Sequence, residues 1–298
     1  MAHNEHFELV EALEPTVAQL LAEHRERRKA WYFHEFIPWE EGRSFVKEPW
    51  EESQATINER ARTSLVLNLL TEDNLPYYHL VLERHLPEGS VWKEWNNLWT
   101  AEEAQHAIAI RAYLLTSRNC DPVELEDDRM ATMQHGYEPD FGHIAELFAY
   151  TSAQELATRV SHRNTGKITE DETAFELMRN VATDEHHHFM VYRGVSQAML
   201  ELDPTVAREG IYRTLKNFQL PGTGIPGFLR RSIEIAKAGV YNLRVHHDHV
   251  LMPLLRQWGI ANLENLDAKA SELQDKIMAL PGEVLAKAER FEARFGMA

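Results

Sequence analysis

Two copies of one short motif place carboxylates beside imidazoles in this chain. Residues 103–106 (EAQH) and 185–188 (EHHH) both read Glu-x-x-His. A lone glutamate precedes each motif by about thirty residues, Glu72 the first and Glu155 the second. The two repeats together supply Glu72, Glu103, His106, Glu155, Glu185 and His188. Four carboxylates and two imidazoles in a helix bundle are the ligand set of a carboxylate-bridged di-iron centre.

The spacing of the repeat predicts the elements that carry these residues. Positions i and i+3 lie on one face of a helix, so Glu and His of one motif can bind the same or neighbouring metal ions. About thirty residues is the length of one long helix that turns back through a loop into the next. One Glu-x-x-His motif alone is typical of a solvated helix face, but the doubled pattern predicts four helices with pseudo-twofold symmetry.

The charges of the six residues also favour a metal site. Four carboxylates carry about four negative charges, which two ferrous ions would neutralise. Carboxylate and imidazole ligands suit iron or manganese better than a metal that prefers sulfur. Without metal, four carboxylates in a core would repel one another and take up protons. The six residues are therefore interpreted as the ligands of a metal site and not as residues that only pack in the core.

Bulk composition excludes several classes of protein. The chain has 298 residues and is 44% hydrophobic, which is enough for a sizeable core. The net charge of −16 argues against nonspecific nucleic-acid binding. No apolar run is long enough to span a membrane, and the first residues do not resemble a signal peptide. Cys120 is the single cysteine, so no intrachain disulfide can form, which fits a cytoplasmic protein.

The pattern of apolar residues and breaks predicts a single all-helical domain over residues 1–298. Its bundle core is expected at about residues 53–202, and residues 203–298 are expected to buttress it. The predicted helices cover residues 9–30, 55–85, 92–118, 121–135, 144–163, 170–202 and 266–295. Pro76 predicts a kink in the second helix, and Thr169 predicts an N-cap. Residues 221–227, rich in Gly and Pro, predict a loop.

Longer sequence blocks around the motifs carry a family resemblance. They are residues 31–38, 71–76 (TEDNLP), 99–106 (WTAEEAQH), 154–158 (QELAT), 161–166 (SHRNTG), 184–188 (DEHHH) and 218–222 (FQLPG). With these blocks the chain resembles the soluble acyl-acyl carrier protein desaturases, especially the actinobacterial type. The resemblance covers roughly residues 10–260, and blocks of this length are more specific than the short motif alone.

The resemblance implies a fold, a reaction and partners. The fold is ferritin-like and all-α, with a four-helix-bundle core and additional N- and C-terminal helices. The family uses a di-iron centre, dioxygen and two electrons to place a cis double bond in a saturated acyl chain on acyl carrier protein. Manganese is an alternative metal, a ferredoxin-like protein is the expected electron donor, and a homodimer is the expected assembly. All six ligands have a counterpart here, with Glu103 and Glu185 as bridging carboxylates and Glu72 and Glu155 as terminal ligands.

The resemblance also assigns roles to residues outside the ligand set. Thr158 matches a threonine near the oxygen-binding side, and Trp31 and Asp184 match residues associated with electron delivery. The residues alone leave other interpretations open, because a helical threonine commonly bonds its own backbone and a tryptophan is commonly a core residue. His186 and His187 replace a basic pair of the family, and they are expected to be exposed or to lie behind the ligands.

Two basic segments could dock an acidic carrier protein in a chain that is acidic overall. One contains Arg25, Arg27, Arg28 and Lys29, just before Trp31. The other contains Arg208, Arg213, Lys216, Arg230, Arg231, Lys237 and Arg244 against Glu209 and Glu234. The alternative interpretation is ordinary solvated helix faces.

Other functions share parts of this pattern. Another di-iron oxidase on the same fold, such as a hydroxylase or an N-oxygenase, is the nearest alternative. A ribonucleotide reductase radical subunit is disfavoured because no tyrosine is identified for a radical. An iron-storage subunit is disfavoured by the length of the chain. A non-catalytic metal-binding homologue is disfavoured by the complete ligand set.

Overall fold

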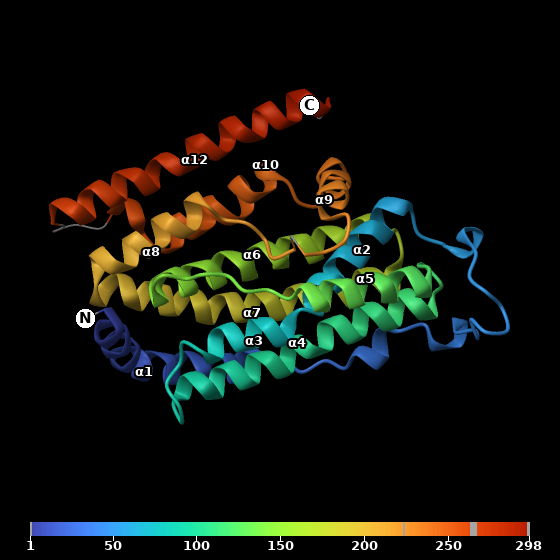
Figure 1. Cartoon of the computed structure of the whole chain (residues 1–298), viewed down its shortest axis with the longest axis horizontal. Coiled ribbons are helices and arrows are strands. Elements are labelled where there is room, and N and C mark those ends of the chain that lie inside the picture. Colours follow the sequence, from blue (N-terminus) through green and yellow to red (C-terminus); the bar gives the residue numbers. More distant parts are fainter. Residues whose placement is uncertain (1, 223, 263–266, 297–298) are drawn as a thin grey trace.

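The computed structural model describes residues 2–222, 224–262 and 267–296. It is 77% helical and has no strand in these residues, which confirms the predicted all-α class (Figure 1). The long helices are α1 Ala2–Arg27, α2 Glu59–Glu72, α3 Leu75–Glu83, α4 Val91–Thr116, α5 Pro122–His135, α6 Ile144–Ile168, α7 Glu172–Leu202, α8 Pro204–Lys216, α9 Phe228–Lys237 and α12 Ala268–Phe295. Between α9 and α12, α10 Leu243–His246, a π-helical turn His247–Leu251 and α11 Met252–Gln257 follow one another directly.

The central layer of the molecule is a bundle of α2 with α3, α4, α6 and α7. Helices α6 and α7 pack against each other along their length, and α2 packs against both α4 and α6. Helix α1 lies against α4 and α7, whereas α8 covers α6 and carries α12 on its far side (Figure 1). Gly210 permits the close approach of α8 to α6, because a Cβ there would lie 2.6 Å from the Ala145 backbone.

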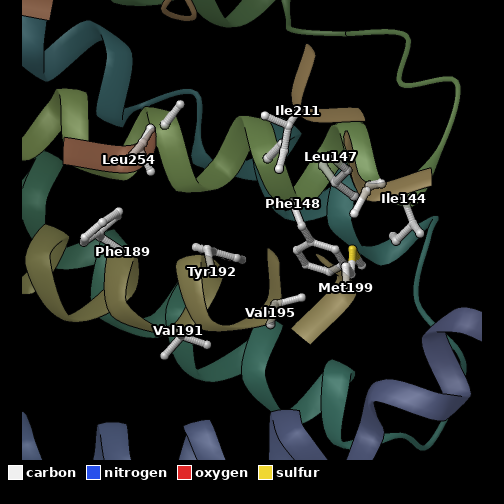
Figure 2. Packing of buried hydrophobic residues seen from close by; sticks show 14 of the residues in the cluster. Ile144, Leu147, Phe148, Phe189, Val191, Tyr192, Val195, Met199, Ile211 and Leu254 are labelled. Carbon is white, nitrogen blue, oxygen red and sulfur yellow. The ribbon is translucent and has the colours of Figure 1, made fainter. Parts of the chain in front are cut away.

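Apolar residues at helical spacing hold α6 and α7 together. Figure 2 shows Phe148 of α6 beside Tyr192, Val195 and Met199 of α7, and all four are at most 1% exposed. Burial of such a side chain contributes roughly 1.5–3 kcal/mol each. This apolar half of the helix pair lies C-terminal to the ligands on α7, so it fixes the register in which those ligands face the rest of the bundle.

Short polar side chains define where several helices begin. An aspartate or asparagine accepts the backbone N–H of the first turn at Asn58, Asp121, Asp171, Asp203 and Asp267. Such caps satisfy donors that have no partner within the helix. Thr169 was predicted to cap the helix at residues 170–202, which is α7, but this prediction was wrong because Asp171 is the N-cap of α7. The Thr169 hydroxyl instead donates to the Gly166 carbonyl at 2.7 Å, at the C-terminal end of α6.

The predicted second helix is in fact two helices, and its first residues are not helical. Helix α2 ends at Glu72, and α3 begins at Leu75 with Pro76 in its first turn. A proline fits there because the first-turn N–H has no helical partner, whereas inside a helix its ring would crowd the preceding turn. The expected kink is therefore a complete break, directly after a predicted metal ligand.

Helix α6 is one turn longer than predicted and ends at Ile168 instead of Arg163. The extra turn contains Thr165, whose hydroxyl lies 2.6 Å from that of Ser64, and Gly166, which lies against α7. These contacts between helices hold the turn in place despite residues of low helix propensity.

The first helix begins at Ala2 and ends at Arg27, whereas residues 9–30 were predicted, and the other predicted segments agree more closely with the structure. Residues 121–135 form α5, and the aromatic segment after α1 contains short 3-10 turns at Phe33–Phe36 and Trp39–Glu41. Two further 3-10 turns are Glu52–Gln54 and Ile260–Asn262. The predicted start of the last helix, Leu266, lies outside the described residues. Among the described helices, none combines the length and the apolar character that a membrane crossing requires.

Candidate metal centre

The four bundle helices bring all six predicted ligands together in the interior. Helix α2 contributes Glu72 from its last residue, and α6 contributes a glutamate from its middle. Helices α4 and α7 each contribute one Glu-x-x-His motif across a single turn. The six side chains are at most 7% exposed: Glu72, Glu103, His106, Glu155, Glu185 and His188.

The six residues form two groups that share two carboxylates. One group is Glu72, Glu103, His106 and Glu185, and the other is Glu103, Glu155, Glu185 and His188. In each group the potential ligand atoms lie within 4.8 Å of one another. Each group could hold one metal ion, and the two ions would then share Glu103 and Glu185.

The free polar atoms of the site fit a pair of metal ions. His106 Nδ1 lies 3.0 Å from Glu103 Oε2, and His188 Nδ1 lies 2.7 Å from Glu103 Oε1. Yet neither nitrogen has a hydrogen-bond partner among the described residues, and the same holds for Glu155 Oε2 and Glu185 Oε2. Buried polar atoms without a partner are costly unless something binds them. Oxygen and imidazole donors of this kind suit iron or manganese.

A second layer of carboxylates orients the two histidines. His106 Nε2 lies 3.4 Å from Asp184 Oδ2, and His188 Nε2 lies 2.9 Å from Glu102 Oε2. A proton on Nε2 that is donated to a carboxylate leaves Nδ1 free to bind metal. Glu102 also contacts His24 at 3.0 Å. Burial raises the pKa of Glu102, but hydrogen bonds with His188 and His24 outweigh burial and lower it to about 2.

The terminal carboxylates have opposite electrostatic surroundings. Burial and the neighbouring Glu185 raise the pKa of Glu155 well above its ordinary value, and its Oε1 accepts a hydrogen bond from Trp99 Nε1 at 3.1 Å. Burial also raises the pKa of Glu72, but contacts with His106 and His162 outweigh burial and lower it. Without metal, negative charge is therefore compensated at Glu72 and not at Glu155.

Trp31 and Asp184 lie in one hydrogen-bonded chain that ends at a predicted ligand. Trp31 Nε1 donates to Asp184 Oδ2 at 2.8 Å, and Asp184 faces His106. Arg28 donates to both oxygens of the same carboxylate, at 3.1 and 2.9 Å. Burial alone would raise the pKa of Asp184, but contacts with His106 and Arg28 lower it. Arg28 also lies 3.3 Å from Glu102, so one guanidinium contacts the carboxylates behind both histidines.

Thr158 is buried near the centre, but its hydroxyl bonds its own helix. Its Oγ1 donates to the carbonyls of Gln154 and Glu155, both at 3.1 Å. The side chain also lines a cavity of about 100 Å³ that Glu72 and His162 reach from other sides. The structure therefore shows the local bonding pattern of a helical threonine beside a small cavity at a metal ligand.

Sequence reasoning missed three residues that contact the ligands: Glu102, Trp99 and His162. His162 Nε2 lies 3.0 Å from Glu72 Oε1 and 3.1 Å from Glu185 Oε1. A signal was present, because Trp99 and Glu102 precede the first motif, and His162 follows Glu155 by two helical turns.

His186 and His187 lie off the ligand face of α7, as expected, and both are partly buried. The ring of His187 meets the ring of His24 edge-on, with 6.2 Å between centroids. Neither residue contributes to the two ligand groups. Their difference from a basic pair therefore changes the outer surroundings of the centre and not its ligands.

The second predicted basic segment is not a free basic surface. Arg208 is fully buried and donates to the Pro204 carbonyl. Ion pairs bind Arg213 to Glu146 and Glu209, Arg231 to Asp128, Lys237 to Glu234, and Arg244 to Glu292. In the first segment, Arg25, Arg27 and Arg28 are likewise paired with acidic residues. Acidic partners, some of them distant in sequence, therefore reduce the free positive charge of both segments, and docking of a carrier protein there stays a prediction.

Comparisons with known proteins agree with this geometry. A family model described as "Fatty acid desaturase" matches residues 5–298. The acyl-[acyl-carrier-protein] desaturase DesA1 of Mycobacterium tuberculosis is 38% identical, with 96% of this chain and 88% of that protein covered. The chloroplastic stearoyl-[acyl-carrier-protein] 9-desaturase 1 of Arabidopsis thaliana is 27% identical over 92% of this chain and 75% of its own.

A solved structure shows the same fold. The X-ray structure of the acyl-ACP desaturase DesA2 from M. tuberculosis superimposes with a TM-score of 0.70 at 23% sequence identity. The match covers 89% of this chain and 99% of the other. The likeness confirms the predicted ferritin-like helical fold.

Proposed function

The chain belongs to the fatty acid desaturase family, and from this premise we propose that its six buried ligands hold two iron ions for desaturation of an acyl chain on acyl carrier protein. The observation that carries the assignment is the pair of ligand groups that share Glu103 and Glu185. In this assignment Glu72 and His106 complete one metal site, and Glu155 and His188 complete the other.

The metal pair would supply the oxidation, using dioxygen and two electrons to remove two hydrogens from neighbouring carbons. The residues of the chain hold, orient and shield that chemistry. Asp184 and Glu102 would hold the proton of each histidine on Nε2, which would leave both Nδ1 atoms free to bind the metal. His162 and Trp99 fix the terminal carboxylates Glu72 and Glu155 from behind.

We propose that electrons reach the centre along Trp31 and Asp184. Support comes from the hydrogen-bonded chain that joins Trp31 Nε1, Asp184 and His106 Nε2. Trp31 is 8% exposed and lies next to the partly exposed segment that follows α1. A ferredoxin-like protein is the proposed donor. Thr158 is proposed to assist proton delivery, which would require its hydroxyl to turn from the helix carbonyls toward the cavity at Glu72.

An apolar pocket beside the centre is the proposed seat of the acyl chain. It is lined mainly by carbon-rich side chains, including Tyr78, Leu82, Phe141 and Leu147, and Trp99 lies at its inner side. Trp99 also bonds the ligand Glu155, so the pocket adjoins the metal centre. The present volume of about 30 Å³ has room for only one or two water molecules. Side chains must therefore move to admit an acyl chain.

We further propose a single cytoplasmic domain that forms a homodimer. Tyr32, Trp39 and Val46, in the segment between α1 and α2, are 57%, 52% and 94% exposed. Exposed apolar side chains that lie near one another in sequence favour a protein–protein contact. The mass in solution, measured by light scattering, should be twice that of one chain. Iron is the proposed metal, with manganese as a substitute that the same donors accept.

Product analysis tests the reaction. Iron-loaded protein, a reductant and stearoyl or palmitoyl carrier protein are incubated in air, and the fatty acid is then released and analysed. A monounsaturated acid is expected, and it should be absent with a Glu103→Gln variant. A hydroxylated acid would instead identify a hydroxylase, and an unchanged acid from fully loaded protein would contradict the assignment.

A further inference from the structure

A cavity of about 280 Å³ lies on the outer side of the helix pair α6 and α7. The ionisable residues of its lining are Arg159 and Arg163 from α6, and Arg179 and His186 from α7. Burial lowers the pKa of His186 to about 4, so the arginines carry the positive charge. No carboxylate lines it. This cationic groove, defined by these four residues, contrasts with a chain whose net charge is −16.

Two of the arginines have no partner. Within the described ranges, Arg159 and Arg163 make no hydrogen bond and no ion pair, whereas Arg179 pairs with Glu176 at the rim. Burial and the nearby charge of Arg163 lower the pKa of Arg159. Like charges four residues apart on a helix repel each other. Other arginines of the chain, such as Arg231 and Arg244, are paired with carboxylates.

The two helices that form the groove approach closely at one end. A Cβ on Gly166 would lie 3.0 Å from Met178 and 3.5 Å from the backbone of Phe175. Arg163, one turn before Gly166, lines the groove together with Phe175 and Arg179 of α7. On the groove's other end, the buried Nδ1 of His186 has no hydrogen-bond partner in the described part of the chain.

We propose that this groove is a binding site for a phosphate group. Guanidinium groups match phosphate oxygens through paired N–H donors, and two unpaired ones beside a third define such a site. The phosphate could be free, or it could belong to phosphopantetheine, the class of prosthetic group that carries acyl chains. None of the four groove residues belongs to either ligand group, so a site for free phosphate is independent of the desaturase reaction, whereas phosphopantetheine as the source rests on the proposed function.

Calorimetric titration tests the proposal. Inorganic phosphate and 4′-phosphopantetheine are titrated separately into the iron-loaded full-length protein. At least one should bind, and the double variant Arg159→Gln/Arg163→Gln should bind it at least tenfold more weakly. Arg84→Gln, which removes an exposed arginine at the end of α3, should change the affinity less than threefold. Circular dichroism and thermal melting confirm that each variant is folded.

The outcomes distinguish the sources and can overturn the site. Phosphopantetheine bound tenfold more tightly than phosphate would identify the prosthetic group, and equal affinities would identify free phosphate. Arg159→Lys/Arg163→Lys, which keeps the charge, should lose less affinity than the glutamine pair. Binding that survives the glutamine substitutions would place the anion elsewhere, such as on the metal, and would overturn the proposal. So would the absence of binding by either compound.

Discussion

In the half of the metal centre that contains His106, a histidine outside the ligand set contacts the unshared carboxylate Glu72. In the half that contains His188, an indole contacts the unshared carboxylate Glu155. Glu72 contacts His162, and His106 faces Asp184 with Arg28 behind it. On the other half, Glu155 accepts from an indole, and the rings of Trp95 and Trp99 lie 6.1 and 6.5 Å from the ring of His188.

This difference has a consequence for how the centre is charged. A protein cation can balance Glu72, but an indole N–H cannot balance Glu155. The pKa of Glu155 therefore rises well above its ordinary value, while that of Glu72 is lowered. The His188 half depends on bound metal to keep its carboxylate ionised, and metal uptake there should release a proton.

Substitution of a carboxylate that both metal sites share should have the largest effect on iron content, because it should affect both halves of the centre equally. Glu103→Gln or Glu185→Gln removes an oxygen ligand from both metal sites, so iron content should fall to near zero and turnover should be lost. Glu72→Gln or Glu155→Gln removes a ligand from only one site and should leave about one iron per chain. Metal analysis after anaerobic loading measures this. Two irons retained in Glu103→Gln would contradict the shared sites.

Substitution of the carboxylates behind the two histidines should distinguish the two halves of the centre by their effect on the rate of reduction. Asp184→Asn and Glu102→Gln should each lower iron affinity by about 10- to 100-fold, because the histidine they orient is no longer held. Asp184→Asn should also slow reduction by the electron donor, since it interrupts the contact between Trp31 and His106. Glu102→Gln should leave the reduction rate per bound iron unchanged. Stopped-flow measurement of the reduction rate distinguishes the two variants. Equal slowing in Asp184→Asn and Glu102→Gln would contradict an electron path through Trp31 and Asp184.

The charge compensation at Glu72 should appear in the pH dependence of stability without metal. Burial would lower the pKa of His162, but Glu185 and Glu72 outweigh burial and raise it to about 9. A raised pKa stabilises the fold fully below the unfolded value near 6.5, and this contribution is lost as pH rises through 9.

The metal-free protein should therefore lose on the order of 2 kcal/mol of unfolding free energy between about pH 6.5 and 9 through His162. Urea unfolding at several pH values measures it. His162→Gln should show a flatter profile, whereas His34→Gln, which changes an exposed histidine, should follow the wild type. If the unfolding free energies of the wild type and His162→Gln changed with pH in parallel, this would contradict the compensation of the Glu72 charge by His162.

The smallest effect is expected at Thr158. Because its hydroxyl bonds helix carbonyls that already have helical partners, Thr158→Val should change the melting temperature and iron content little. If the hydroxyl assists proton delivery, the fraction of consumed oxygen that yields product should fall. Oxygen uptake measured together with product gives this ratio. Thr158→Ser, which keeps a hydroxyl, should restore it, and an unchanged ratio in Thr158→Val would leave only a packing role.

The ligands were predictable from the sequence because each motif spans one helical turn, which local periodicity determines. The family resemblance implied that Glu103 and Glu185 are shared, and both residues belong to the two ligand groups of the structure. The break after Glu72 was predicted only as a kink, because a proline can bend a helix or begin a new one. Charge compensation was not predictable: Arg208 and Arg231 count as basic in sequence, but their burial and pairing depend on helices that are far apart in the chain.

The end of α2 gives Glu72 a freedom that the other five ligands lack. Glu72 is the last residue of its helix, and Asp73 and Asn74 follow it before α3 begins, whereas the others lie within uninterrupted helices. A shift of the backbone at Glu72 requires a change in one junction, but a shift of the backbone at Glu155 would require the displacement of a packed helix. Tyr78 of α3 lines the apolar pocket and donates to the Thr71 carbonyl, so an occupant that displaced Tyr78 would act on the residue beside Glu72. Filling of that pocket would thus reach Glu72 through this junction, and within the described part of the chain Glu155 has no such connection to α3.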